Sequence, residues 1–370
     1  MKKQISFVSL LTLLSLQAPI HAAWASKERP DPKKEVVTPP PNTPGFKLQD
    51  NRTWYIETDY LLWKPSLEDT SFALKGTGST NPTTHAVVGK EKIQQPSFHW
   101  SSGVRLGLGG YTHDSWDVGF RGTYLYSDAH STIHADPARN QIIAPQWFSS
   151  IFGTQGTKAT ANWKMNFFLL DFTMGREYFL TKRFSVHPFI GIRSAAIFLK
   201  DRSRFRSNFQ ASSTSTFAVS DRFSAQQHIW GVGPRIGFDL NFYVTCDWSF
   251  IGGLSGSLLY THYKVKERFQ GFYAPTTTTI APFDLKGKQS NHFGRGNIDA
   301  YFGFGWSHWY NNGSTRVTIA LAFEAQQWFN LNQFFSLESV TPNNTLDLQV
   351  DKNHGDLSLI GGTLHFKVDF

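Results

Sequence analysis

Side chains of alternating character run through most of the sequence. Between positions 54 and 64, Trp54, Ile56 and Leu62 share one face, whereas Glu57 and Asp59 share the other. Successive side chains of a β-strand point to opposite sides, so a period of two predicts strands with one apolar face and one polar or glycine-rich face. The pattern recurs in ten segments, at residues 54–64, 100–111, 116–126, 168–175, 184–193, 230–241, 248–260, 297–306, 316–324 and 360–370.

Short and long connections alternate along the chain between these segments. The short connections are residues 112–115, 180–182, 244–245 and 310–314, and the long polar ones are residues 65–99, 127–160, 200–222, 264–292 and 330–355. This alternation is typical of an up-and-down barrel with short periplasmic turns and long extracellular loops. We therefore predict an all-β fold, a transmembrane antiparallel barrel of at least ten strands. Twelve to sixteen strands stay open, because long connections can hide short strands.

The composition agrees with a barrel that turns every second side chain towards lipid. Aromatic residues make up 15% of the chain and charged residues only 17%. After the N-terminal region no apolar run approaches the length of about 18 residues that a spanning helix requires. Tryptophans lie towards the segment ends, where an interfacial girdle is expected: Trp100, Trp116, Trp163, Trp230, Trp248, Trp306 and Trp328.

The N-terminal region carries the pattern of a secretory signal peptide. Met1, Lys2 and Lys3 give a positive start, residues 5–16 are apolar, and residues 23–25 form an Ala-x-Ala cleavage site. The next stretch is rich in proline and charge, which excludes a helix or a paired strand there. We predict a signal peptide at residues 1–25, a proline-rich periplasmic leader at 26–52 and the barrel at 53–370.

The final segment ends on an aromatic residue of its apolar face. Phe366, Val368 and Phe370 alternate with polar residues up to the last position. This ending resembles the signal that the barrel assembly machinery of the outer membrane reads. We expect that machinery and outer-membrane lipid to be partners of the chain.

Several segments resemble one known family of membrane proteins. They are residues 54–65 (WYIETDYLLWKP), 169–176 (LLDFTMGR), 188–193 (PFIGIR), 230–237 (WGVGPRIG) and 328–333 (WFNLNQ). The chain resembles the Legionella-type outer-membrane proteins, also called major-outer-membrane-protein-like porins, of legionellae and environmental chlamydiae. The resemblance covers residues 54–370 and implies a porin of the outer membrane that is exposed on the cell surface. The major porins of pathogenic chlamydiae are rich in disulfide-linked cysteine, whereas Cys246 here has no second cysteine to pair with.

The faces opposite the apolar ones would line the interior of the barrel. Their charged residues are the candidate pore lining: Glu57, Asp59, Arg105, Asp117, Arg121, Asp171, Arg193, Arg235, Asp239, Asp299, Arg316 and Glu324. In a wet lumen such charges remain hydrated and set ion selectivity. We expect a porin for passive diffusion of small hydrophilic solutes, with weak selectivity because the signs nearly balance. The alternative is that these residues pair across the interior and stiffen a closed barrel.

Other functions were weighed against a porin. A surface adhesin or structural barrel would act through its long loops, and an outer-membrane hydrolase is less favoured because no catalytic constellation is recognisable. Asp128, His130, His134 and Asp136 offer metal-binding side chains, although loop polarity explains them equally well. The formal charge of +8 is scattered and forms no stripe for nucleic acid. We expect no enzyme activity, cofactor, metal or nucleic-acid partner, and leave a homo-oligomer open.

Overall fold

The computed structural model describes residues 53–80, 87–112, 116–139, 141–146, 156–210, 216–273, 281–310, 315–340 and 347–370. The predicted signal peptide (1–25) and leader (26–52) lie outside these residues. In the described part of the chain no helix is long and apolar enough to cross a membrane.

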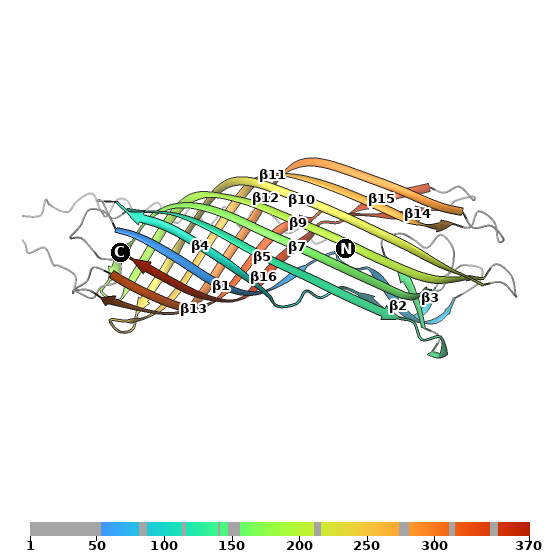
Figure 1. The fold of residues 1–370 in the computed structure, drawn as a ribbon, viewed down its shortest axis with the longest axis horizontal. Helices are drawn as coiled ribbons and strands as arrows, with labels where there is room; N and C mark the ends of the chain where they lie inside the picture. Colours follow the sequence, from blue (N-terminus) through green and yellow to red (C-terminus); the bar gives the residue numbers. More distant parts are fainter. Residues whose placement is uncertain are drawn as a thin grey trace, which may run out of the picture. The chain divides into compact units, whose positions relative to one another are not determined.

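Ten antiparallel strands close into a barrel, which confirms the predicted fold (Figure 1). Each strand pairs with its neighbours, and the pairing of the first strand with the last completes the circle. In order around the barrel the strands are β1 (Thr53–Leu67), β4 (Ser101–Tyr111), β5 (Trp116–His134), β7 (Gly156–Arg176), β9 (Phe184–Gln210), β10 (Thr216–Tyr243), β11 (Trp248–Tyr273), β12 (Ala281–Tyr310), β13 (Thr315–Asn332) and β16 (Gly355–Asp369).

The remaining elements are short. They are β2 (Ala73–Thr80), β3 (Val87–Gln94), the 3₁₀ turn η3 (Pro137–Arg139), β6 (Gln141–Pro145), β8 (Tyr178–Thr181), β14 (Phe335–Val340) and β15 (Asp347–Lys352). Strands β2, β3, β14 and β15 lie at the end of the barrel opposite the C-terminus (Figure 1).

The predicted apolar faces point outward around the half of the barrel nearest the C-terminus, which we call the lower barrel. The half beyond it is the upper barrel. On β1, for example, Trp54, Ile56 and Tyr60 are each more than half exposed, whereas the alternate residues Glu57 and Asp59 are buried inside. Outward apolar side chains on neighbouring strands form one continuous band. We call this the lipid-facing band, since such a surface is the one that a transmembrane barrel presents to lipid.

The short-turn end of the barrel holds both ends of the barrel chain. The backbones of Trp54 and Phe370 exchange two hydrogen bonds of 2.9 Å, which close the seam between β1 and β16. Phe366 and Phe370 of the predicted assembly signal point outward on β16. Short turns face the periplasm in bacterial barrels, so the opposite end is extracellular.

Four strands are far longer than the sequence pattern predicted. Strands β9 to β12 contain 26 to 30 residues each, whereas a tilted strand crosses the bilayer with about 9–11. Most of residues 200–222 and 264–292 is therefore strand, and the prediction of long loops there was wrong. These strands carry the barrel wall on beyond the lipid-facing band.

The polarity of the two faces is exchanged in this extension. In β11, Leu258 and Tyr260 point outward and Ser257 inward, but further along Lys266 points outward and Phe269 is buried inside. The alternation is thus unbroken, and the apolar side chains move from the outer face to the inner face. The reason is solvent, because lipid surrounds the lower barrel and water surrounds the upper barrel.

The interior of the upper barrel is filled by an apolar core. Side chains from the strands pack with residues of the long connections, including Phe72, Phe98 and Phe334, which are at most 3% exposed. Trp163 and Trp328 belong to this core, so placing them in the interfacial girdle was wrong. Trp163 and Trp328 are each five residues from an outward phenylalanine, Phe168 and Phe323 respectively. Because side chains alternate along a strand, an odd spacing places both tryptophans inside.

Candidate functional site: the interior of the lower barrel

One cavity of about 370 Å³ lies inside the lower barrel, and all twelve predicted pore-lining residues line it. They come from eight of the ten barrel strands, from Glu57 and Asp59 on β1 to Glu324 on β13. They meet because each occupies the inward position of its alternating strand. The structure therefore brings the whole predicted set together, while their role in passing solute remains a prediction.

Arg193 on β9 is the centre of the largest ion-pair cluster. Its guanidinium donates to Asp171 at 2.7 and 2.8 Å and to Asp299 at 2.5 Å, and its side chain is 2% exposed. It also donates to Asn297. Arg235 on β10 shares the same two carboxylates, at 2.9 and 3.5 Å. Two cations and two anions thus balance within one buried cluster.

A second cluster joins β4 and β5 to carboxylates on β1 and β13. Arg105 donates to Asp59 on β1 at 2.8 Å and to both oxygens of Glu324 on β13, at 3.0 and 2.9 Å. Arg121 on β5 donates to Glu57 at 2.6 Å. Arg105 and Asp59 lie in register on the paired strands β4 and β1. The other two pairs join strands that are two or three places apart in the barrel, so they brace one side of the wall from within.

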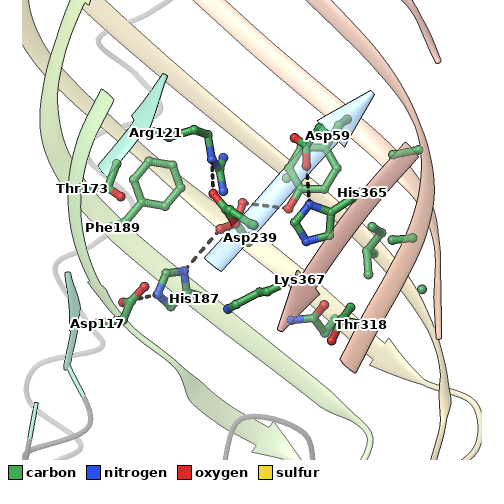
Figure 2. A pocket seen from close by; sticks show the side chains of 18 of the residues that line it. Asp59, Asp117, Arg121, Thr173, His187, Phe189, Asp239, Thr318, His365 and Lys367 are labelled. Carbon is green, nitrogen blue, oxygen red and sulfur yellow. Dashed lines mark hydrogen bonds and ion pairs between the residues drawn. The ribbon is translucent and has the colours of Figure 1, made fainter. Parts of the chain in front are cut away.

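The sequence interpretation missed several interior groups. His187 lies between Asp117 and Asp239, at 2.7 and 3.3 Å, and His365 contacts Asp59 at 2.6 Å (Figure 2). Lys367 and Asp369 also lie inside, 3.3 Å apart, and Asp369 pairs with the predicted Arg316 at 2.9 Å. Arg316 itself was in the predicted set. The sequence did contain a signal for these residues, because each of their side chains occupies an inward position in its alternating strand. The predicted set contained only aspartate, glutamate and arginine side chains, and none from the last strand.

Ten of the twelve predicted residues have an ion-pair partner of opposite charge, and the other two, Asp117 and Asp239, both contact His187. The balance of signs expected from the sequence is therefore met by direct contacts. A carboxylate and a guanidinium held at 2.5–3.5 Å are committed to each other and not to a passing ion. The arrangement favours stiffening of the barrel over conduction.

The apolar core closes the interior above this cavity. Phe167 on β7 and Trp328 on β13 are in edge-to-face contact, with ring centroids 5.7 Å apart. These two strands are five apart in a circle of ten and thus diametrically opposed. Trp163 on β7 similarly meets Phe334 at 5.4 Å. Aromatic side chains therefore meet across the full width of the barrel.

The metal-binding candidates occupy positions that differ from those expected. Asp128, His130 and His134 lie on β5 rather than in a loop, and Asp128 and His130 are exposed on its outer face. His130 is hydrogen-bonded to Asn162 at 2.5 Å, and Asp136 pairs with Arg139 at 3.3 Å. Among the described residues no group of three or more metal-binding side chains is gathered in one place.

A closed barrel with an apolar outer band and a polar lower interior defines an integral β-barrel protein of the outer membrane. Within this class, the chain belongs to the family described as the Legionella pneumophila major outer membrane protein precursor, which it matches over residues 49–370. This confirms the resemblance found in the sequence. A comparison with curated proteins finds no match.

Solved structures share the barrel architecture at low similarity. The outer membrane protease OmpT from Escherichia coli is 9% identical, with a TM-score of 0.36, over 87% of this chain and 96% of that chain. A FadL homologue from Pseudomonas aeruginosa is 9% identical, with a TM-score of 0.27, over 87% and 90%. The toluene transporter TodX from P. putida is 9% identical, with a TM-score of 0.26, over 89% and 91%. Similarity at this level does not bear on function.

Proposed function

We propose that the protein is a surface barrel, closed to solutes at rest, that acts through its extracellular extension. The contact between Phe167 and Trp328 carries this proposal, because it joins opposite walls of the barrel inside an apolar core. A hydrated ion or small polar solute would have to lose its water to enter such a core, which costs several kcal/mol or more. The interior ion pairs below it support the same view.

The length of the extension supports a role in contact with molecules outside the cell. Strand β9 runs on to Gln210, twelve residues beyond Phe198, which lies at the upper limit of the lipid-facing band. With about 3.3 Å per residue and a strand tilt near 40°, the wall rises roughly 30 Å above the band. A rigid wall of this height holds its connections well clear of the membrane, as a contact protein requires.

A second candidate is the porin expected from the sequence. The cavity of about 370 Å³ favours it, since a space lined by charged and polar side chains already exists in the lower barrel. Opening of the apolar core would then complete a path for small hydrophilic solutes. Under this candidate the closed arrangement is a resting state.

Single-channel recording in planar bilayers separates the two candidates. We expect folded, heat-modifiable protein to give no conductance steps, and we expect Phe167→Ala combined with Trp328→Ala to introduce them. Phe168→Ala is the matched control, because Phe168 neighbours Phe167 but points towards lipid. Reproducible steps from the unaltered protein would overturn the surface-barrel proposal and establish the porin.

The surface-barrel proposal includes no catalytic step. We expect folded protein to leave a fluorogenic peptide library and a labelled phospholipid intact over hours. Hydrolysis that survives purification and disappears on heat unfolding would replace the proposal with an outer-membrane hydrolase.

A further inference from the structure

The outer wall above the lipid-facing band is strongly basic on one side of the barrel. On strands β7 and β9 to β12, the outward positions carry twelve lysine and arginine side chains, all half-buried or exposed. We call this surface the basic face, and its residues are Lys158, Lys164, Lys200, Arg202, Arg204, Arg206, Arg222, Lys264, Lys266, Arg268, Lys286 and Lys288.

Like charges lie directly opposite one another across neighbouring strands of the basic face. Lys266 is in register with Lys288, and Arg268 with Lys286. The same holds for the pairs Arg204 and Arg222, Lys164 and Lys200, and Lys158 and Arg206. Like charges in opposed positions destabilise a sheet. An anion bound between the strands would relieve this repulsion.

The protein supplies little of this negative charge. Among the described outward positions of these strands and of β5 beside them, the carboxylates are Asp284, which pairs with Arg268 at 2.6 Å, and Asp128, in register with Lys164. Asp201, Asp221 and Glu267 occur on the same strands but point inward, and each is at most 9% exposed. Most of the basic face has no acidic neighbour.

The basic face begins where the lipid-facing band ends. Lys200 follows the outward Phe198 by two residues, and Lys264 follows the outward Tyr260 by four. At about 3.3 Å per residue and a strand tilt near 40°, these cations stand roughly 5–10 Å above the last lipid-facing side chains. That is the depth of the headgroups in the outer leaflet.

We propose that the basic face binds the phosphate groups of glycolipid headgroups in the outer leaflet of the membrane. Arginine and lysine are suited to phosphate, arginine through paired hydrogen bonds and lysine as a point charge. The position at headgroup depth favours a membrane lipid over a soluble polyanion. A row of opposed cations on four long neighbouring strands binds several phosphates side by side.

The far side of the barrel provides an internal comparison. Strand β1 is five strands away from β10 in the circle of ten. Its Lys64 is exposed two residues beyond the outward Leu62, just as Lys200 is two residues beyond Phe198, but Lys64 is in register with the apolar Ile360 on β16. Lys64 thus offers one isolated cation at the same depth.

The test uses the full-length chain folded in micelles of an uncharged detergent. Diphosphorylated lipid A is added, and bound lipid is counted by native mass spectrometry to give a Kd. We expect binding to weaken by about tenfold or more when Lys164, Lys200, Arg202 and Lys264 are all changed to Gln, because these cations lie nearest the lipid-facing band. Lys266→Gln alone should weaken it less, and Lys64→Gln should leave it unchanged. Heat-modified migration on gels confirms that each variant is folded.

Three further probes decide the chemistry. Dephosphorylated lipid A should bind at least about tenfold more weakly, and millimolar inorganic phosphate should not displace the lipid. Equal binding of phosphorylated and dephosphorylated lipid, or equal loss in Lys64→Gln, would overturn the proposal. Heparin that binds more tightly than lipid A, with the same dependence on the four basic residues, would assign the face to a soluble polyanion instead.

Discussion

Arg193 shows how a single residue can hold the lower barrel together. It is 2% exposed and joins β9 to carboxylates on β7 and β12. Removing it leaves Asp171 and Asp299 with only Arg235 to balance them. The lower interior therefore depends on this side chain for charge balance as well as for packing.

Replacing Arg193 by Met should lower the free energy of unfolding by about 3–5 kcal/mol, because breaking a buried pair strands the remaining charge. Urea unfolding in lipid vesicles, followed by tryptophan fluorescence, measures the change. Arg268→Met is the control, since its ion pair with Asp284 is exposed, and should leave the unfolding midpoint unchanged. Equal effects of the two substitutions would show that the interior ion pairs contribute no more to stability than an exposed ion pair does.

Glu267 is an uncompensated acid in the upper barrel, seven residues beyond Tyr260 and outside the lipid-facing band. Its Oε1 accepts a hydrogen bond from the Phe335 backbone, and its Oε2 has no hydrogen-bond partner among the described residues. Burial, with a contribution from Asp201, raises the pKa of Glu267 from 4.5 to about 9. The folded protein therefore holds a proton here at neutral pH.

This proton makes stability depend on pH. Between about pH 4.5 and 9 the folded state keeps the Glu267 proton that the unfolded state releases. The free energy of unfolding should fall through this window by about 1.4 kcal/mol per pH unit from this group, and its contribution is complete below pH 4.5. Glu267→Gln should flatten the slope in urea titrations at several pH values, whereas exposed Asp128→Asn should not. An unchanged slope in Glu267→Gln would contradict the assignment.

At the scale of elements, the seam between β1 and β16 depends on a glycine. A Cβ atom at Gly361 would lie 2.1 Å from the carbonyl oxygen of Leu62, whereas one at the neighbouring Gly362 would meet nothing within 4 Å. The two positions therefore form a natural pair for testing how tightly the barrel must close.

Gly361→Ala should destabilise the barrel by about 1–3 kcal/mol through overpacking and lower the yield of heat-modifiable protein. Gly362→Ala should fold with normal yield. Refolding both variants into the same detergent and comparing folded fractions on gels measures the difference. Matching yields would mean that the seam can widen to admit a methyl group.

The strands of the lower barrel could be predicted from sequence because apolar and polar residues alternate there in the sense expected for lipid. The upper halves of β9 to β12 could not, because their outward arginines and lysines look like loop polarity. Their inward residues, such as Phe205 and Val265, keep the period of two. The strict alternation of inward and outward positions was therefore a better guide to strand length than the hydrophobicity of either face. The same alternation identified the charged residues that point into the barrel. It does not say which of them pair, because pairing depends on how far each side chain extends across the interior.

At the scale of the whole molecule, the exchange of faces fixes how deep the barrel sits in the membrane. Leu254 lies near the middle of the outward apolar positions of β11, between Trp248 and Tyr260. Gln270 points outward on the same strand, beyond the band. The outer face of β11 therefore contacts lipid at Leu254 and water at Gln270.

Leu254→Arg should cost about 2–4 kcal/mol of unfolding free energy, the value for arginine on the lipid face near the bilayer midplane. Gln270→Arg should cost far less, because water surrounds that position. Urea titration of both variants in vesicles gives the comparison. Equal costs would mean that the membrane does not lie at the lipid-facing band.

The exchange of faces also constrains how strand lengths can drift during evolution. One inserted or deleted residue inside β9 to β12 would turn every following side chain to the other face. Below the exchange this sends charges into lipid, and above it sends phenylalanines into water. Relatives should therefore gain or lose residues inside these strands in twos, and vary freely in length only where the strands end.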